Sequence, residues 1–251
     1  MKLYWGITAS RSYGKVIPAN EAVIISAGGL WRGDRFMQKR SLIWRDIALD
    51  SGGFVALNKW GDFPFTPDMY LNLVNIIGPK WAASMDFPCE PSIAKGTKLT
   101  VNERITATVD YAVYLTSKSE LITPVLQGYT ALEYEECWRL LSAKIQVKRL
   151  AIGSICKRQS TAEISTLCYN LRQFLPDIPI HGFGVKLRAL AYPEVWSLFS
   201  SIDTNAWEFH RRGKSWAGTK LTDAIAWKNY FEKVEKLKNN PRQLCLKAVK
   251  R

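Results

Sequence analysis

Long hydrophobic runs and closely paired cysteines are both missing from this sequence of 251 residues. No stretch of about 18 apolar residues occurs, and the first residues, MKLYWGITASRSYGK, lack the pattern of a signal peptide. We therefore expect a cytoplasmic protein that has no membrane partner. The cysteines are odd in number, are widely spaced and form no CxxC or CxC pair, which argues against a disulfide framework and a metal site: Cys89, Cys137, Cys156, Cys168 and Cys245.

Acidic residues are also scarce relative to basic ones. The 22 Asp and Glu residues stand against 35 Lys and Arg residues, which gives a net charge of +13 and a pI near 9.6. This surplus of positive charge favours a polyanionic partner. The alternative interpretation is a charged surface that only keeps the protein soluble.

Two segments interleave basic and aromatic residues, WRGDRFMQKRSLIWR (31–45) and FHRRGKSW (209–216). Basic side chains can neutralise phosphates while aromatic rings stack on unpaired bases. Amphipathic segments with buried Trp and solvated Arg are the alternative. The nucleic-acid-binding residues that we predict here are Arg32, Arg35, Lys39, Arg40, Arg211, Arg212 and Lys214.

Short β-like runs alternate with helical stretches along the chain, whose 47% apolar and 23% charged residues are typical of a globular protein. The candidate strands are 3–8, 22–26, 46–50, 81–86, 121–127, 149–154, 178–184 and 199–203. Eight such runs are what a (β/α)8 barrel requires. Amphipathic helices are predicted over 131–145, 160–175 and 222–238, and the second opens with a Ser-x-x-Glu capping box.

No internal repeat, low-complexity tract or linker divides the chain. The sequence therefore predicts one α/β domain over residues 1–251, a TIM barrel followed by a basic C-terminal helix and tail.

Polar residues and glycines stand at the C-terminal ends of five predicted strands: Asp50, Asp86, Gln127 with Gly128, Gly153 with Ser154, and Asp203. In a parallel barrel these ends converge on the mouth that holds the active site. A single strand-end Asp is typical of a helix N-cap, but three of them together with the Gln and the glycines predict a binding site. Two glycines also follow Asp50 and Ser51, so we expect a ligand to approach this backbone closely.

Six segments resemble the tRNA-guanine transglycosylases, and in particular their DNA-acting relatives in phages and bacterial genomic islands. In the order of that family they are LDSGGF (49–54), SMDFPCEP (84–91), VLQG (125–128), AIGS (151–154), HGFGV (181–185) and SIDTNAW (201–207). The resemblance covers roughly residues 46–210. It implies a glycosyltransferase that breaks a guanine glycosidic bond and installs a 7-deazaguanine base.

The resemblance also implies roles for individual residues. Base exchange without net hydrolysis needs a nucleophile that holds the anomeric carbon of the sugar, and a carboxylate does this in other glycosyl transfers. By similarity to the family, Asp203 is the predicted nucleophile and Asp50 the predicted general acid and base.

The remaining residues are predicted to bind the base. Asp86 would accept hydrogen bonds from the amine and N1 of guanine, while Gln127 and the backbone of Gly153 and Ser154 would meet O6. Phe54 would stack on one face of the base and His181 on the other, with a core aromatic and a structural histidine as the alternatives. The complete predicted set is Ser51, Gly53, Phe54, Asp86, Gln127, Gly128, Gly153, Ser154 and His181.

The sequence departs from the tRNA-acting members of the family in two respects. Their Cys-x-Cys-x-x-Cys zinc cluster is absent, since only Cys245 follows His210, so we expect no zinc and no other cofactor. LCLKAVKR follows soon after the predicted barrel, so we do not expect the additional RNA-binding domains of archaeal members. We therefore expect DNA and a free 7-deazaguanine base as substrates, with tRNA as the alternative nucleic acid.

Two other functions stay open. One is a non-catalytic nucleic-acid-binding barrel that senses a guanine-like base. The other is a barrel glycosidase that uses Asp50 and Asp203 on a small nucleoside. The sequence does not define an oligomeric state.

Overall fold

Short parallel strands alternate with helices along much of the described chain. The computed structural model describes residues 1–7, 16–37, 42–93, 97–158, 160–205 and 228–236. Within these residues nine strands pair in parallel, in the order β7-β6-β5-β2-β1-β11-β10-β9-β8. They are β1 (Lys2–Ile7), β2 (Ala22–Ser26), β5 (Asp46–Asp50), β6 (Trp81–Ala83), β7 (Ile122–Thr123), β8 (Val125–Leu126), β9 (Leu150–Ile152), β10 (Ile180–Gly182) and β11 (Ser201–Thr204).

The two end strands, β7 and β8, close this ladder into a barrel. They are parts of one segment that is interrupted by Pro124, which has no N–H to donate. Before the proline, Thr123 O accepts a hydrogen bond of 2.8 Å from Ser84 N, next to β6. Pro124 O accepts one of 2.9 Å from Ala151 N in β9. Nine strands thus occupy eight positions, in chain order, and the predicted (β/α)8 TIM-type barrel is confirmed.

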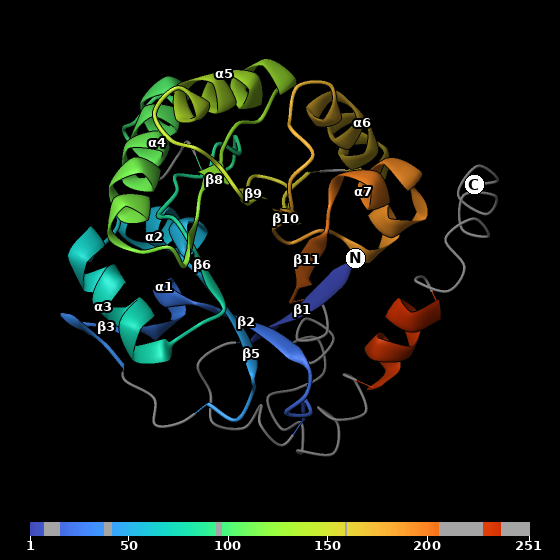
Figure 1. Ribbon diagram of the computed structural model, residues 1–251, viewed down its shortest axis with the longest axis horizontal. Coiled ribbons are helices and arrows are strands. Elements are labelled where there is room, and N and C mark those ends of the chain that lie inside the picture. Colours follow the sequence, from blue (N-terminus) through green and yellow to red (C-terminus); the bar gives the residue numbers. More distant parts are fainter. Residues whose placement is uncertain (8–15, 38–41, 94–96, 159, 206–227, 237–251) are drawn as a thin grey trace.

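Helices surround the strands, as Figure 1 shows for α3 to α7. The described helices are α1 (Ala27–Leu30), α2 (Gly53–Trp60), α3 (Pro67–Ile77), α4 (Val101–Lys118), α5 (Ala131–Ser142), α6 (Thr161–Arg172), η2 (Leu187–Ala191, a 3-10 helix) and α7 (Pro193–Leu198). Local sequence fixes several starts, because Thr100 and Thr130 each form a capping box with the Glu three residues later. None of the described helices has the length and apolarity needed to cross a membrane.

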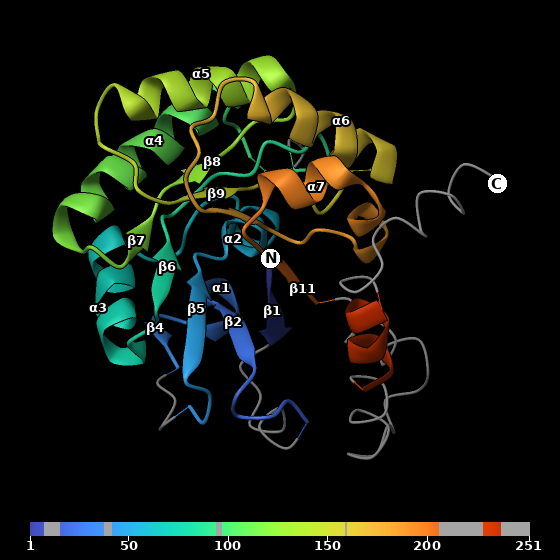
Figure 2. The same ribbon diagram turned by 45° about the vertical axis from the view of Figure 1, so that its right-hand side comes forward.

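Residues 228–236 form a further helix, which Figure 2 shows beside β11. Tyr230 anchors it, since its ring lies 6.1 Å from that of Trp5 in β1 and its hydroxyl lies 3.2 Å from Thr204 Oγ1. This helix falls within the predicted 222–238, whose other residues lie outside the described part. The predicted C-terminal tail lies outside it as well.

The predicted elements agree with the structure except at their ends, since the predicted helices 131–145 and 160–175 also end three residues earlier, at Ser142 and Arg172. Strands 22–26 and 46–50 match, whereas 81–86, 149–154 and 178–184 are shortened to three residues each. The fifth run splits at Pro124. The strand ends are shorter because the chain leaves the ladder there and carries its polar residues into the mouth. A hairpin, β3 (Trp31–Arg32) and β4 (Arg35–Phe36), adds two strands that the sequence analysis does not predict.

The side chains of each strand alternate between two apolar layers, as the two-residue period of a strand requires. In β1, Leu3, Trp5 and Ile7 pack in the layer that includes residues of the surrounding helices, and Tyr4 points the other way. The barrel interior is filled by Tyr4, Ala22, Ile24, Ala48, Trp81, Ala83, Val125 and Ala151. Small alanines make room for the large rings, and the interior is a packed core.

Candidate active site

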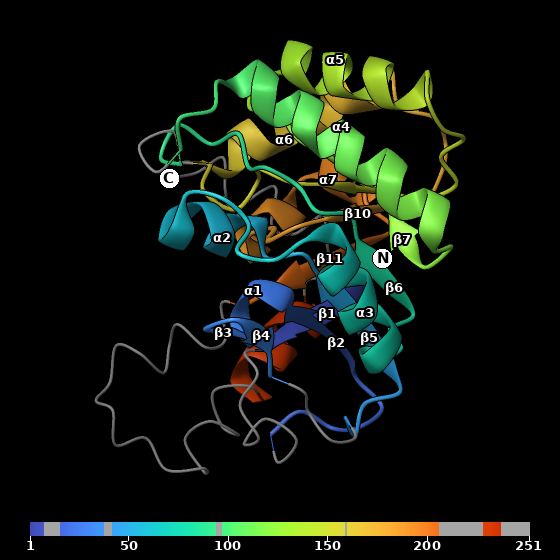
Figure 3. The same cartoon turned by 90° about the vertical axis from the view of Figure 1, so that its left-hand side faces the viewer.

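The C-terminal mouth of the barrel brings together Asp50, Asp86, Gln127, Ser154 and Asp203. Figure 3 shows this end on the side of α1, α2 and the β3–β4 hairpin, opposite the N-terminus. The three carboxyls are close enough to interact, because Asp203 raises the pKa of Asp50 and Asp50 raises the pKa of Asp86. The structure therefore gathers residues that are far apart in the sequence, as the sequence analysis predicts.

Asp50 is the last residue of β5 and pairs with Ser26 of β2 in the ladder. The residue keeps an edge accessible to solvent, but its carboxyl is enclosed by protein. Desolvation by this burial raises its pKa from 3.8 to about 6, and Asp203 adds to the rise, while the nearby Ser26 hydroxyl and the backbone of Gly52 and Ser51 oppose it. A carboxyl with this pKa can both give and take a proton near neutral pH.

Asp86 lies just beyond β6 and is 6% exposed. Its Oδ1 accepts a hydrogen bond of 2.5 Å from Ser51 Oγ, and its Oδ2 accepts one from Gln127 Nε2. Burial raises its pKa to about 7, with further increases from Asp50 and Glu90 that the two hydrogen bonds only partly oppose. Near neutral pH this carboxyl is only partly ionised, so a ligand that donates hydrogen bonds to it would stabilise its charge.

A row of hydrogen-bond acceptors continues from Asp86 across the mouth. Ser154 Oγ lies 2.5 Å from Gln127 Oε1 and 2.9 Å from Glu90 Oε2, and it also accepts a bond of 2.8 Å from Cys89 N. One hydroxyl proton cannot serve both oxygens, so the row holds more acceptors than donors. Such a row favours a ligand rich in N–H groups.

Glu90 was not predicted from the sequence, although it lies inside the quoted segment SMDFPCEP. It is 1% exposed, and Cys156 Sγ donates to its Oε1 over 3.7 Å. Its partners Ser154 and Cys156 are 64 and 66 residues away in the chain. A glutamate in an otherwise apolar stretch was the signal that could have found it.

Helix α4 holds the loop that carries Asp86 and Glu90. The buried Arg104 donates to Pro88 O over 2.7 Å, and Phe87 N donates to Thr108 Oγ1 over 2.9 Å. These bonds satisfy buried polar groups and fix the loop. Ser154 adopts a left-handed backbone with φ 54°, which is uncommon outside glycine and is a form of strain that clusters at functional sites.

Three of the predicted glycines serve the packing of the backbone. A Cβ on Gly53 would meet the carbonyl oxygen of Asp86, one on Gly52 would meet the backbone of Gly28, and one on Gly128 would lie 2.7 Å from Tyr134 N. Protein backbone thus occupies the space beside both alpha carbons, and the pair lets α2 approach the loop of Asp86. The close approach of a ligand to this backbone stays a prediction.

Gly153 is likewise engaged within the barrel. Its N–H donates to Leu126 O over 3.0 Å, and its carbonyl accepts from the hydroxyl of Tyr134 over 2.6 Å. A Cβ at this position would overlap the side chain of Gln127. The backbone of Gly153 is thus used by the fold, and the predicted contact of its N–H with O6 of a base does not agree with this geometry.

Asp203 lies in β11, opposite Tyr4 in the ladder, and is 7% exposed. Its Oδ1 accepts a hydrogen bond of 2.8 Å from Gly184 N and lies 3.4 Å from Nε2 of His181. The ring of His181 is buried among Trp81, Phe183 and Tyr4, with centroid distances of 4.8, 4.8 and 5.7 Å. The structure therefore places His181 beneath Asp203 with aromatic rings around it, which does not favour the predicted stacking on a base.

Two half-buried aromatic rings lie near the mouth. Phe54 opens α2 and packs in a cluster with Ala56, Leu57, Phe87 and Ile93, and the ammonium of Lys157 lies 5.3 Å from its ring centre. Phe183 follows β10 and packs against the barrel interior. Phe183 was not predicted, although it stands in the quoted segment HGFGV. Stacking of Phe54 on a base stays a prediction.

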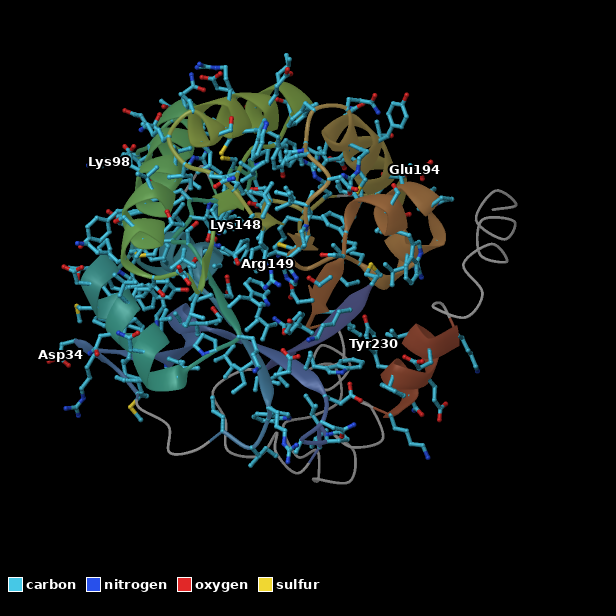
Figure 4. The ribbon with its side chains drawn as sticks, in the orientation of Figure 1. Asp34, Lys98, Lys148, Arg149, Glu194 and Tyr230 are labelled. Atoms are coloured by element: carbon cyan, nitrogen blue, oxygen red, sulfur yellow. The ribbon has the colours of Figure 1, made fainter. Side chains whose placement is uncertain are left out.

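Of the predicted nucleic-acid-binding residues, the structure describes Arg32 and Arg35. They face each other in the β3–β4 hairpin, which follows β2 on the mouth side, and both are exposed. Asp34 at the tip of this hairpin is labelled at the edge of the molecule in Figure 4. The others lie outside the described residues: Lys39, Arg40, Arg211, Arg212 and Lys214.

Four free cysteines are described, three buried and Cys156 partly exposed. Within the described part of the chain, no group of three or more His, Cys, Asp or Glu side chains is arranged to hold a metal ion.

A closed parallel barrel with catalytic-type side chains at the carboxyl ends of its strands defines the class of (β/α)8-barrel enzymes. A family model described as DpdA, DeoxyPurine in DNA protein A, matches residues 28–237. The chain belongs to this family, the DNA-guanine transglycosylases related to tRNA-guanine transglycosylase, which confirms the resemblance inferred from the motifs. None of the curated proteins that were compared with the chain matches it.

Proposed function

We propose that this protein exchanges guanine in DNA for a free 7-deazaguanine base through a covalent intermediate on Asp203. The observation that carries the proposal is the arrangement of three interacting carboxyls and a surplus of acceptors at the mouth of the barrel. Family membership supports transglycosylation of guanine in general, and the family description refers to deoxypurine in DNA.

The row of acceptors suits the edge of a guanine-like base. Guanine presents N1–H and an exocyclic amine along one edge, and Asp86 offers two carboxylate oxygens there. Gln127 lies next in the row, where the base carries O6, and its Nε2, which donates one hydrogen bond to Asp86, has a second N–H to offer. Adenine lacks the N1–H donor and would leave buried acceptors unpaired, so the site would reject it.

The exchange takes place in two steps at the anomeric carbon. In the first, Asp203 Oδ2 bonds to C1′ while the C1′–N9 bond breaks, and the departing guanine keeps the electron pair and takes a proton from Asp50. In the second, N9 of the incoming base attacks C1′, its proton passes to Asp50, and the Oδ2–C1′ bond breaks to restore the carboxylate. A carboxyl with a pKa of about 6 suits both halves of this cycle.

DNA as the polymer agrees with the net charge of +13 and with the two arginines of the β3–β4 hairpin beside the mouth. An extruded guanine would enter the mouth while basic residues around it hold the phosphates. tRNA is the second candidate, through the kinship of the family with tRNA-guanine transglycosylase.

The proposal is tested by incubating protein with a DNA duplex and a 7-deazaguanine base, followed by denaturing gels and mass spectrometry of nucleosides. We expect a covalent DNA adduct and base exchange in the wild type, and neither in Asp203→Ala. Asp46→Asn is the matched control, because Asp46 begins β5 at the opposite mouth, where it pairs with Lys2, and this variant should keep its activity. A fully active Asp203→Ala would overturn the proposal, and exchange confined to tRNA would overturn the choice of DNA.

A further inference from the structure

Two nitrogens lie close to the same oxygen of Asp203. Gly184 N donates to Oδ1 over 2.8 Å, and Nε2 of His181 lies 3.4 Å from that oxygen. No donor among the described residues reaches Oδ2. Within the described part of the chain, one oxygen of the carboxylate is therefore held and the other is available to react.

Among the described residues, Nε2 of His181 has no other polar contact. It is buried and makes no regular hydrogen bond within the described residues, and its surroundings are the rings of Tyr4, Trp81 and Phe183. Because a buried N–H without a partner is unfavourable, Asp203 Oδ1 is the acceptor that this geometry offers to it. A small shift would bring the 3.4 Å separation to hydrogen-bonding distance.

Ser201 faces the other nitrogen of this ring and can determine its tautomer. The other ring nitrogen, Nδ1, lies 2.9 Å from Ser201 Oγ. If the serine hydroxyl donates to Nδ1, the proton of a neutral imidazole is on Nε2 and faces Asp203. The opposite tautomer would place a lone pair against a carboxylate oxygen, which is repulsive.

We propose that His181 is a positioning residue for the nucleophile, which it orients through Oδ1 so that Oδ2 attacks the sugar. This rests on the proposed role of Asp203. While the Oδ2–C1′ bond exists, Oδ1 is the carbonyl oxygen of an ester, and the donors polarise it. When that bond breaks, its electron pair returns to the carboxylate and the same donors stabilise the charge. His181 thus acts in both halves of the exchange without touching the base.

The decisive variants are His181→Leu and His181→Gln. Leucine fills the space without a donor, whereas the side-chain amide of glutamine can place an N–H near the position of Nε2. We expect His181→Leu to form the covalent DNA adduct about 100-fold more slowly, the loss typical of removing one such donor, and His181→Gln to remain within about 10-fold of the wild type. Affinity for the free base should not change in either variant. Equal losses in both variants, or a wild-type rate in His181→Leu, would overturn the proposal.

Substitutions of Ser201 and Ser200 provide a second, milder test in case replacement of the buried His181 impairs folding. Both serines line the same cavity of about 240 Å³ at the N-terminal mouth. Figure 4 labels Arg149, which also lines it, near the centre of the barrel. Ser200 Oγ donates to Ile180 O over 2.9 Å and does not touch the imidazole.

Ser201→Ala should slow adduct formation about 10-fold by releasing the tautomer, an effect typical of outer-shell partners of a ligating histidine, and Ser200→Ala should not. Equal rates in these two variants would contradict the proposal. Failure of the proposed function can be distinguished from failure of the positioning role of His181, because the wild type itself would then form no adduct that depends on Asp203.

Discussion

Replacement of Asp86 by Asn should make the protein more stable at pH 8 while it weakens base binding. The pKa of this carboxyl rises from 3.8 to about 7 on folding, chiefly because burial disfavours its charged form. One pKa unit corresponds to about 1.4 kcal/mol, so ionised Asp86 destabilises the fold by at most roughly 4 kcal/mol above pH 7. The neutral amide of Asn avoids this penalty.

The sign of this stability change follows from how many protons the folded and the unfolded chain bind at each pH. Below pH 4 the carboxyl is protonated in the folded and the unfolded chain, and the penalty is absent. Between pH 4 and 7 the unfolded chain releases its proton while the folded chain retains it, so stability falls as the pH rises. Above pH 7 both forms are ionised and the penalty is constant.

The expected gain is smaller than the upper bound for two structural reasons. Part of the pKa rise is repulsion from Asp50, which the two carboxyls share. The new NH2 group of the Asp86→Asn variant would also face the NH2 group of Gln127, so the Gln127 amide has to turn for its oxygen to accept this hydrogen bond, which leaves its own NH2 group toward Ser154 Oγ. We therefore expect Asp86→Asn to gain about 1 to 3 kcal/mol at pH 8 and nothing at pH 4.

Urea unfolding followed by tryptophan fluorescence measures this difference at pH 4, 6 and 8, and the ten tryptophans of the chain supply the signal. Asp50→Asn is the companion variant. The stability gain of Asp50→Asn over the wild type should have the same sign and should level off near pH 6, where the pKa of Asp50 lies. A stability difference between Asp86→Asn and wild type that does not vary with pH would refute this reasoning.

Three further predictions concern the ligands and the backbone. Affinity for guanine should rise between pH 6 and 8 as Asp86 ionises and accepts two hydrogen bonds, and calorimetry that shows a flat profile would contradict its role. Gly53→Ala should lose about 1 to 3 kcal/mol of unfolding free energy in urea titrations, because its Cβ meets the Asp86 carbonyl, whereas Gly29→Ala, with nothing within 4 Å, should not. Replacing Arg32 and Arg35 by Ala should flatten the slope of log DNA affinity against log salt by about 2, and an unchanged slope in binding titrations would indicate a surface charge without a DNA contact.

The barrel and the mouth were predictable because both depend on local sequence. Strand 46–50 is apolar and ends in Asp50, and its bounds match the structure. In a parallel barrel, the end of a strand is enough to place a side chain at the mouth, whichever strands are its neighbours. The motif order around Asp86 and Asp203 then identified the family that the family model shows.

The roles that depend on distant neighbours were not predictable. Gly53 was expected to face a ligand, but the atom beside it is the carbonyl of Asp86, which a sequence cannot place. His181 was assigned to the base because of its motif, and its real neighbours are Asp203 and Ser201 on the adjacent strand β11. Closure at Pro124 also required the structure, since a proline within a run signals an interruption without showing which strands pair on either side.

An acidic mouth in a basic protein sorts the parts of a nucleotide by charge. The phosphates of a polynucleotide are attracted by the overall charge of +13 but are repelled by the carboxyls of Asp50, Asp86 and Asp203. A guanine base carries no net charge and presents N–H donors, so it can enter where a phosphate cannot. In the free protein, burial and mutual repulsion hold the pKa values of Asp50 and Asp86 near neutrality, and the donors of the base relieve part of that penalty on binding. Under the proposed function, the carboxyls that destabilise the empty fold are thus the same groups that distinguish a base from its phosphate backbone.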